Sequence, residues 1–511
     1  MGASVGIERD RGHQRSLILH TTTEICSIFQ SAVQSRIAAV LLAVVSDLLL
    51  PDHEPEGALI FRFPTECRSR QILAAFTRWD AAHFLNVAGD GWDQHEYSHA
   101  FFPMFPLMIR WLAHALAPLF ASSLCVDELR VVIGVFLSNA AFVVAACCLH
   151  ALSLRILRDP LVARTAARIF CVAPASVFFS TLYAESSFAA STFAGLLLLE
   201  RGAPWAASLV LAFATGCRAN GVMNVVPMAY MGVRRLSKVL DGYDSDAWRQ
   251  AGCALGVAMS CVVQCALILA PYVGWQTVGY HRVCDFAGKK SASPPRSSAA
   301  AADLAFAPTR IARTAADSCL PADWCEQRLP DLYAHVQSQY WGVGLFQYYT
   351  WWQLPNFALA APALLLCAGA TFETVRLLRA RCARARRACK ASDGHRVILC
   401  ATLREALGLG CCKRREVDTA TGGGSLAPRT LIYVVQWASL SALALLVANV
   451  QTTTRLVGAA SPPVYWFMAH LLLRRGGLGF ASERLRTYTL GYIALFALAG
   501  TAAHSNYMPW T

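Results

Sequence analysis

Blocks of apolar residues alternate with short polar or charged segments along almost the whole chain after residue 32. A helix of about 20 apolar residues spans the hydrocarbon core of a bilayer, so this pattern predicts membrane-spanning helices. We expect an all-α polytopic membrane protein with about 11 transmembrane helices (roughly 8–12), the shorter ones being broken or re-entrant. The expected spans are 33–50, 131–154, 165–182, 186–200, 204–217, 221–233, 251–273, 355–377, 429–450, 462–473 and 486–503.

Two segments depart from the simple pattern of spans. Residues 1–32 begin as a polar stretch, and no small-residue cleavage site follows the first apolar run. We therefore expect a cytosolic N-terminal tail rather than a signal peptide, followed by one multi-span domain over residues 33–511. Residues 101–120 are apolar and aromatic, and the charge balance favours a helix lying in the luminal membrane interface. A true crossing by this segment is the alternative.

Charge sets the expected orientation. Only 15% of the residues are charged, yet the net charge is +13, and residues 376–416 carry twelve Lys or Arg against three Asp or Glu, a net +9. Basic loops between membrane spans face the cytosol, so we expect the loop 376–428 to be cytosolic rather than a nucleic-acid site. Counting outward from it, the stretches 51–130, 275–353 and 451–461 are then luminal, as is the C-terminus.

The cysteines and the low-complexity segments carry little information about chemistry. Most of the nineteen cysteines lie inside apolar blocks, without a spacing suited to zinc, and we expect neither a metal nor a cofactor. The segment 288–302 has the composition of a flexible insertion. We single out four cysteines in expected luminal loops, where a disulfide is permitted and the pairing stays open: Cys67, Cys284, Cys319 and Cys325.

Asp80 is the leading candidate for chemistry. It follows Trp79 in the first expected luminal loop, close to the membrane surface, where an ionisable side chain is costly and often functional. A carboxylate among apolar rings can act as a general base, and an Asp at this position can equally cap a helix that starts at Ala81. His83 lies one turn later on the same face, as an orienting group or a plain surface histidine. The other acids of this loop read as a solvated set: Asp90, Asp93 and Glu96.

Three further polar groups interrupt apolar sequence near expected luminal helix ends. Glu185 and Arg218 can either pair with each other for structure or bind a lipid phosphate, and Asn220 lies in the same TGCRANG block as Arg218. Arg455 is a second candidate for a phosphate clamp. The aromatic and amide-rich stretch 333–349 suits either a sugar or a membrane-interface belt. Its candidate residues are His335, Gln337, Tyr340 and Trp341.

Eight blocks in this order resemble the PIG-V family of mannosyltransferases. They are FTRWDAAHFLNVAGDGW, HAFFPMFP, APASVFFSTLYAESSFA, TGCRANG, LPDLYAHVQSQYWGVGLFQYY, QLPNF, TTTRLVGAASPPVYW and the terminal SNYMPWT. The resemblance covers residues 70–511, apart from the insertion 288–316 and the loop 380–425. Many related multi-span mannosyltransferases carry two acids in the first loop, whereas here a single Asp80 follows Trp79.

The resemblance implies a C-type glycosyltransferase fold in the endoplasmic reticulum membrane, with a luminal active site. The family uses dolichyl-phosphate mannose to add the second mannose, α-1,6-linked, to the mannosyl-glucosaminyl-acylphosphatidylinositol precursor of glycosylphosphatidylinositol (GPI) anchors. A β-linked donor and an α-linked product imply inversion, which needs one base, here Asp80, and no covalent intermediate. The family also implies a small membrane partner subunit. The residues expected to bind substrate or donor are Trp79, His83, Glu185, Arg218, Asn220, His335, Gln337, Tyr340, Trp341 and Arg455.

Two other readings stay open. One is a different dolichyl-phosphate-sugar-dependent mannosyltransferase, for instance one that acts on the dolichol-linked oligosaccharide. The other is a lipid transporter or scaffold without enzymatic activity. A transporter is expected to show internal repeats, and none is evident in the sequence.

Overall fold

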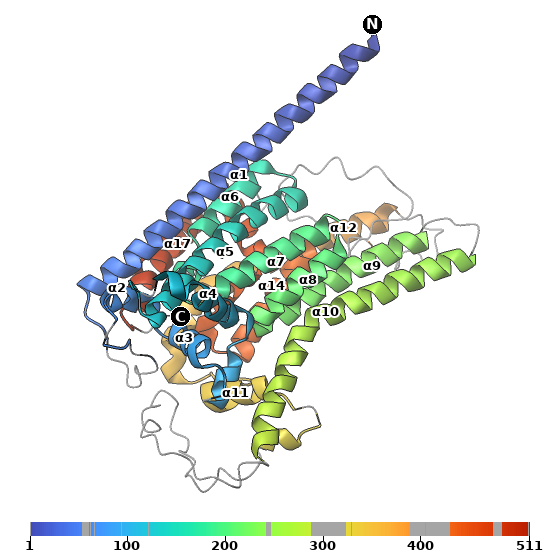
Figure 1. The fold of residues 1–511 in the computed structure, drawn as a ribbon. Coiled ribbons are helices and arrows are strands. Elements are labelled where there is room, and N and C mark those ends of the chain that lie inside the picture. The colour runs from blue at the N-terminus through green and yellow to red at the C-terminus, as the bar shows by residue number, and fades with distance from the viewer. Residues whose placement is uncertain are drawn as a thin grey trace.

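The computed structural model describes residues 2–53, 61, 63–65, 67–93, 95–120, 122–241, 247–287, 323–328, 330–388, 404, 430–473, 483–508 and 510 (Figure 1). Within these ranges every regular element is a helix, as the apolar pattern predicted. The insertion 288–302, Cys319 and most of the basic loop 376–428 lie outside the described residues.

Each of the expected spans overlaps a helix. The bounds of these helices are α1 Gly2–Leu49, α5 Val126–Leu157, α6 Pro160–Cys171, α7 Glu185–Glu200, α8 Pro204–Cys217, α9 Val225–Asp241, α10 Ala247–Ala287, α12 Leu354–Ala388, α14 Leu431–Leu446, α16 Pro462–Leu472 and α17 Glu483–Ser505. In the described ranges four helical stretches are long and apolar enough to cross a membrane: Thr23–Leu49, Val126–Leu157, Ala247–Cys284 and Trp351–Ala380. The first of them starts earlier than the expected residue 33, and the total of about 11 crossings stays a prediction.

The expected span 165–182 is wrong in its bounds. Helix α6 begins directly after Asp159, whose carboxylate caps it, and ends at Cys171. The chain then passes through Pro174 and forms a short 3-10 helix, η3, at Ser176–Phe179. A proline has no backbone N–H and disfavours the α conformation in the residue before it, so the helix does not continue through this segment.

The helices of the bundle pack closely around α7, which lies between α5 and α8. Gly195 of α7 faces Leu211 of α8, and a Cβ at this glycine would lie 2.5 Å from Cδ2 of that leucine. Small residues at such contacts let two membrane helices approach each other. On the other side of α5, the rings of Phe142 and Phe170 stack with centroids 4.5 Å apart. The long helix α1 lies along α5, α6 and α17 and extends beyond the bundle towards the N-terminus (Figure 1).

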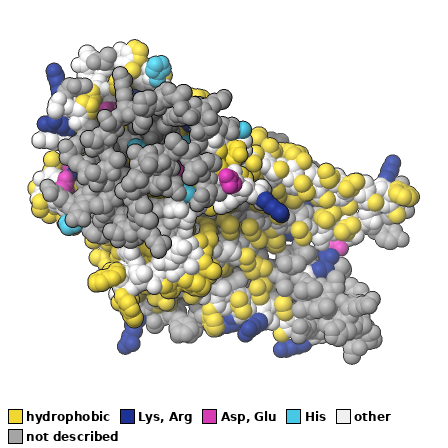
Figure 2. Space-filling model, turned by 90° about the horizontal axis from the view of Figure 1, so that it is seen from below, with side chains coloured by type: hydrophobic (Ala, Val, Ile, Leu, Met, Phe, Trp, Pro, Cys, Tyr) yellow, Lys and Arg dark blue, Asp and Glu magenta, His cyan; other side chains and the backbone are white. Residues whose placement is uncertain are grey.

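The outer surface is strongly apolar. Hydrophobic side chains cover much of the described surface in the view of Figure 2. On α10, Leu255 and Val262 are each more than 60% exposed, as expected for side chains that face hydrocarbon. Trp351 and Trp352, at the start of the fourth candidate span, are 89% and 91% exposed. Tryptophans at the end of a span are typical anchors at the membrane interface.

The elements from the expected luminal stretches gather at one end of the bundle, together with the C-terminus (Figure 1). Helix α10 contains Pro271 and bends on its way to this end, as helices commonly do at proline. The elements of this end are α2 Arg70–Leu73, η1 Ala74–Phe76, α3 Asp80–Asp90, η2 Glu96–Ala100, α4 Met104–Phe120, α11 Leu332–Trp341 and α15 Thr453–Ala460. Helix α4 packs on α3 and α5 and leaves Trp111 and Leu119 at least 70% exposed, which suits an interfacial helix and a crossing alike.

Two disulfides staple this end. Cys67 is bonded to Cys125, and Cys284 is bonded to Cys325. The sequence left the pairing open, and Cys125 was not among the four cysteines singled out for a disulfide. It lies at the end of the first expected luminal stretch, directly before the apolar block of α5, so its position alone did not distinguish it from a membrane cysteine.

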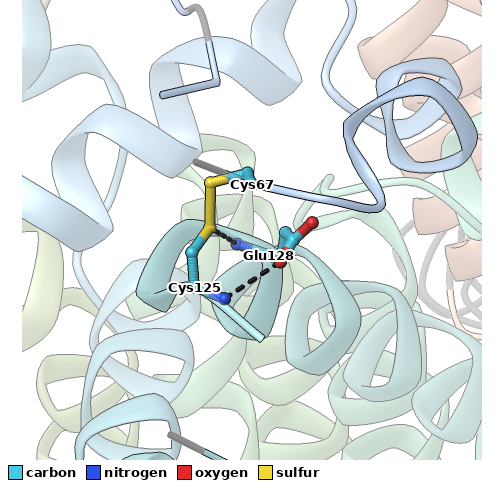
Figure 3. A group of neighbouring side chains, drawn as sticks. All are labelled: Cys67, Cys125 and Glu128. Atoms are coloured by element: carbon cyan, nitrogen blue, oxygen red, sulfur yellow. Dashed lines mark hydrogen bonds between the residues drawn. A yellow bond between two sulfur atoms is a disulfide. The ribbon is translucent and has the colours of Figure 1, made fainter. Parts of the chain in front are cut away.

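Glu128 completes the first staple (Figure 3). Its carboxylate accepts a hydrogen bond from the Cys125 amide (2.9 Å) and another from the Ser69 amide. Cys125 and Glu128 form a capping box at the start of α5. Cys67, Cys125 and Glu128 lie close enough to be considered as metal ligands, but the two thiols are bonded to each other and the carboxylate serves backbone amides. The group therefore acts as a structural staple that joins the first loop to α5.

Candidate active site

Helix α3 begins at Asp80, and the residue before it has an unusual backbone conformation. Trp79 has φ 57° and ψ −131°. A positive φ in a residue other than glycine costs on the order of 1–3 kcal/mol and persists only where the surroundings impose it. The start of α3 has no side-chain capping hydrogen bond, so the interpretation of Asp80 as a helix cap is wrong. Its carboxylate instead accepts a hydrogen bond from Nη1 of Arg455, at 2.7 Å.

Asp80 and Arg455 belong to an ion quartet with Glu185 and Arg218. Glu185 begins α7 and is fully buried, and its Oε1 lies 2.5 Å from Nη1 of Arg218 at the end of α8. The same Oε1 lies 3.8 Å from Nη1 of Arg455 on α15. The pairing of Glu185 with Arg218, expected from the sequence as one alternative, is confirmed. Four charged groups from distant parts of the chain thus meet at one place.

The electrostatics of the quartet keep Asp80 ionised. Burial by itself raises the pKa of the Asp80 carboxyl, but the charge and hydrogen bond of Arg455, together with the charges of His83 and Arg218, bring the pKa below its usual value. The side chain of Asp80 is nevertheless 40% exposed to solvent, whereas the side chain of Glu185 is fully buried. Asp80 is therefore the acid of the quartet that an incoming molecule can reach. The guanidinium of Arg455 also makes cation–π contacts with the rings of Phe178 and Tyr183, whose centroids lie 5.2 and 5.6 Å from its carbon.

Two candidate residues beside the quartet in sequence carry buried polar atoms that have no hydrogen-bond partner within the described residues. They are the indole nitrogen of Trp79 and both amide atoms of Asn220, two residues after Arg218. Buried polar groups are nearly always hydrogen-bonded in folded proteins, so each exception requires an explanation. A substrate with hydroxyl or phosphate oxygens can supply the partners that these groups lack.

His83 belongs to an aromatic wall beside Asp80. The wall consists of His83, Tyr97, Phe101, Tyr340 and Trp341. The imidazole of His83 stacks on Phe101 with centroids 4.7 Å apart and meets Tyr97 edge-on at 5.5 Å. Tyr97 contacts Tyr340 at 5.5 Å, and Phe101 contacts Trp341 at 6.2 Å. Burial lowers the pKa of His83 below its ordinary value, so the ring is neutral at pH 7. Through Tyr97 and Phe101, the wall links α11 of the second expected luminal stretch to α3 of the first.

Glu96 binds side chains of α11 next to the aromatic wall. Its Oε1 accepts a hydrogen bond from the Trp324 indole (3.0 Å), and its Oε2 accepts one from the Tyr340 hydroxyl (3.1 Å). Nε2 of His335 lies 3.7 Å from the same carboxylate. Two of the expected substrate-binding residues, His335 and Tyr340, thus contact Glu96. The interpretation of Glu96 as a purely solvated acid is wrong, because the loop that buries it is distant in sequence.

The remaining loop acids, Asp90 and Asp93, and the candidate Gln337 form no hydrogen bond or ion pair with the quartet among the described residues. The Asp93 side chain is 74% exposed and lies 3.3 Å from Arg282, and Asp90 is exposed, as expected for a solvated loop. Gln337 is half-buried on α11. Sequence reasoning missed Tyr183, whose ring contacts Arg455 and whose hydroxyl lies 3.1 Å from Nε2 of His504. Its place two residues before Glu185, in a block already singled out, was the available signal.

Comparison with known proteins finds relatives over nearly the whole chain. The family described as Mannosyltransferase (PIG-V) matches residues 25–511. GPI alpha-1,6-mannosyltransferase 2 of Rattus norvegicus is 31% identical over 95% of this chain and 98% of its own length, and the Homo sapiens protein of that name is 30% identical over the same shares. The solved oligosaccharyltransferase of Archaeoglobus fulgidus aligns with 92% of this chain and 55% of its own at 12% identity, with a TM-score of 0.36, which is too low to show a shared fold. The extent of the family match shows that the chain belongs to the PIG-V mannosyltransferase family.

Proposed function

We propose that this mannosyltransferase adds the second mannose, through an α-1,6 linkage, to the mannosyl-glucosaminyl-acylphosphatidylinositol precursor of GPI anchors. The donor is dolichyl-phosphate mannose. The relatives that align end to end with this chain are named for α-1,6 transfer to GPI, and this supports the acceptor and the linkage. The observation that carries the proposal is the ion quartet, since it holds a partly exposed, ionised carboxylate on Arg455 and brings Arg218 to the same site through Glu185.

The quartet supplies the groups that an inverting transfer needs. Asp80 takes the proton from the 6-hydroxyl of the acceptor mannose as that oxygen attacks C1 of the donor sugar. The bond from C1 to the phosphate oxygen breaks, and the electron pair leaves with dolichyl phosphate. Attack on the face opposite the leaving group converts a β-linked donor into an α-linked product. The charge that develops on the phosphate is stabilised by Arg218, so the proposed mechanism requires no metal and no cofactor.

Arg455 and Arg218 have different roles in the proposed mechanism. Arg455 donates directly to Asp80 and contacts two aromatic rings, so its role is to hold the base ionised and oriented. Arg218 pairs only with Glu185 among the ion pairs of the described residues, which leaves the rest of its fork for a phosphate. The unpaired nitrogens of Trp79 and Asn220 are suited to sugar or phosphate oxygens, and Oδ1 of Asn220 is suited to a sugar hydroxyl. The aromatic wall, which includes Trp341 and has Gln337 nearby on α11, offers a stacking surface for a sugar ring.

We propose that the protein is a multi-pass enzyme of the endoplasmic reticulum with about 11 crossings, a C-type glycosyltransferase fold and a luminal active site. The net +9 of residues 376–416 supports a cytosolic loop there. Both disulfides lie in stretches 51–130 and 275–353, and disulfides persist in oxidising compartments such as the lumen.

Protease treatment of sealed microsomes tests this orientation. An epitope placed near Ser392 in the basic loop should be removed, because that loop faces the cytosol. An epitope placed near Glu56, between the first span and α2, should be protected until detergent opens the vesicles. The reverse pattern would contradict the orientation and with it the luminal active site.

The function itself is tested by expression in cells that lack the second GPI mannosyltransferase. We expect surface GPI-anchored proteins to return and the accumulated one-mannose lipid to be converted to the two-mannose lipid. Conversion by the purified chain alone would show that the small membrane partner expected from the family is dispensable. If the one-mannose lipid persists while a dolichol-linked oligosaccharide gains mannose, the chain is a different dolichyl-phosphate-mannose-dependent enzyme. Persistence of both lipids in folded, correctly localised protein would favour a transporter or scaffold.

A further inference from the structure

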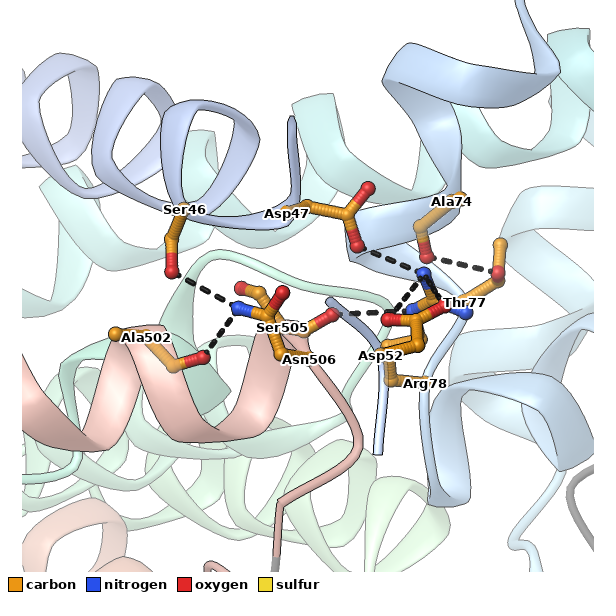
Figure 4. A network of polar contacts seen from close by, with 9 residues as sticks. All are labelled: Ser46, Asp47, Asp52, Ala74, Thr77, Arg78, Ala502, Ser505 and Asn506. Carbon is orange, nitrogen blue, oxygen red and sulfur yellow. Dashed lines mark hydrogen bonds and ion pairs between the residues drawn. The ribbon is translucent and has the colours of Figure 1, made fainter. Parts of the chain in front are cut away.

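A dense polar network surrounds Arg78, the residue before Trp79 (Figure 4). Arg78 is 9% exposed. Its Nη2 donates to Oδ1 of Asp47 at 2.7 Å and lies 3.0 Å from Oδ2 of Asp52, and its Nε donates to the carbonyl oxygen of Ser505 at 3.1 Å. One guanidinium thus binds the end of α1, the segment after it and the end of α17. A lysine has no fork that can reach all three.

The C-terminal tail closes this network from the other side. Asn506 is fully buried, and its side-chain Nδ2 donates to Oγ of Ser46 at 2.9 Å. The backbone carbonyl oxygen of Asn506 accepts a hydrogen bond from the backbone amide of His53 at 2.9 Å. The next residue, Tyr507, lies under the Arg78 guanidinium, 4.4 Å from its carbon, and contacts the ring of Trp79 at 6.1 Å. Residues from both ends of the chain therefore hold the two residues that precede Asp80.

The backbone of Trp79 needs such a constraint. Its φ of 57° is disfavoured for a bulky side chain, and a conformation of this kind persists only where neighbouring contacts over-determine it. Arg78 fixes the chain on one side of this residue, Tyr507 fixes its ring, and Asp80 begins α3 on the other side with its carboxylate on Arg455. If the peptide relaxed to negative φ, the direction of the first turn of α3 would change and the carboxylate would leave its place.

We propose that Arg78, gripped by Asp47, Asp52 and the C-terminal tail, is a positioning residue that holds Trp79 in its positive-φ conformation and so sets the Asp80 carboxylate against Arg455. This inference rests on the proposed role of Asp80 as the base. Arg78 does not touch the substrate, and it acts through the backbone of its neighbour. The alternative is that Arg78 only joins the chain ends, in which case its loss changes stability but not the turnover of the folded enzyme.

The first measurement compares turnover in purified Arg78→Met and Arg78→Lys, each normalised to folded protein. We expect Arg78→Met to lower kcat about 10- to 100-fold, because a displacement of about 1 Å at a reacting group has effects of that size, with little change in KM for either substrate. Arg78→Lys should recover part of the loss, because the charge between the two aspartates is kept. Arg164→Met is the matched control, since Arg164 pairs with Glu24 at the other end of the same candidate span. It should keep the wild-type kcat.

The second measurement is a double-mutant cycle with Asp80→Asn. If Arg78 acts through Asp80, Arg78→Met should reduce kcat in the wild type and add no further loss in the Asp80→Asn background. Additive losses, or a wild-type kcat in folded Arg78→Met, would overturn the positioning role while leaving Asp80 as the base. Should Arg78→Met fail to fold, Tyr507→Ala is used in the same cycle with the same criteria. A fully active Asp80→Asn enzyme would instead overturn the assignment of Asp80 as the base, and the positioning role with it.

Discussion

We expect Asp80→Asn to lower kcat by about 10² to 10⁴, the range typical of a lost general base, with the one-mannose lipid accumulating in cells. Asparagine keeps the size of the side chain and an oxygen that can still accept the hydrogen bond from Arg455, now 2.7 Å from the carboxylate. It cannot take a proton from the acceptor hydroxyl. The measurement is turnover per folded molecule with dolichyl-phosphate mannose and the one-mannose lipid, together with protein yield and acceptor binding.

Asp93→Asn is the control for this variant. Asp93 lies in the same loop, its side chain is 74% exposed, and it pairs with Arg282 on the surface. Its replacement should leave kcat unchanged. The lowered pKa of Asp80 means that the wild-type carboxylate is ionised throughout the neutral range, so protonation of Asp80 does not limit the rate at pH 7. A folded Asp80→Asn enzyme with wild-type turnover would contradict the assignment of the base.

The second large effect is expected at Arg218, in the use of the donor. Arg218→Lys should raise the KM for dolichyl-phosphate mannose about 10- to 100-fold, the value of a hydrogen bond to a charged group, because a fork of donors becomes a single ammonium. The lysine still offers a charge to Glu185, whose carboxylate is fully buried. Arg218→Ala leaves that carboxylate without its nearest partner, a change that typically costs about 3–5 kcal/mol of stability. The lysine variant is therefore the more informative of the two.

Arg282→Lys is the matched control for Arg218→Lys. Arg282 also pairs with an acid, but on the exposed loop and not in the quartet, so its replacement should leave the donor KM unchanged. The assay is steady-state transfer at saturating acceptor, with melting temperature as the measure of folding. If folded Arg218→Lys and Arg218→Ala both bind donor as the wild type does, the ion pair with Glu185 is structural only. The phosphate would then be sought at Arg455.

The local sequence pattern was enough to predict several features. Apolar periodicity over windows of about 20 residues predicted an all-helical membrane protein, because helix formation and burial in lipid depend on neighbouring residues. Charges that interrupt such blocks are costly, and this singled out Glu185, Arg218 and Arg455 as well as Asp80 without a structure. The same reasoning failed at 165–182, where the helix starts earlier, after the cap at Asp159, and the apolar block is divided near Pro174 into two short helical elements.

Only the tertiary structure decided how these residues are combined. Asp80 as a helix cap and Asp80 as a base require the same local sequence, and only the fold places its carboxylate against Arg455, which lies 375 positions away in the chain. The partner of Cys67 and the contact of Glu96 with α11 likewise depend on segments that meet only after folding. The hydrogen bonds of Arg78 to Asp47 and Ser505 join segments near both ends of the chain. Long-range pairings of this kind leave no periodic signal, because each depends on how the helices pack rather than on the residues beside it.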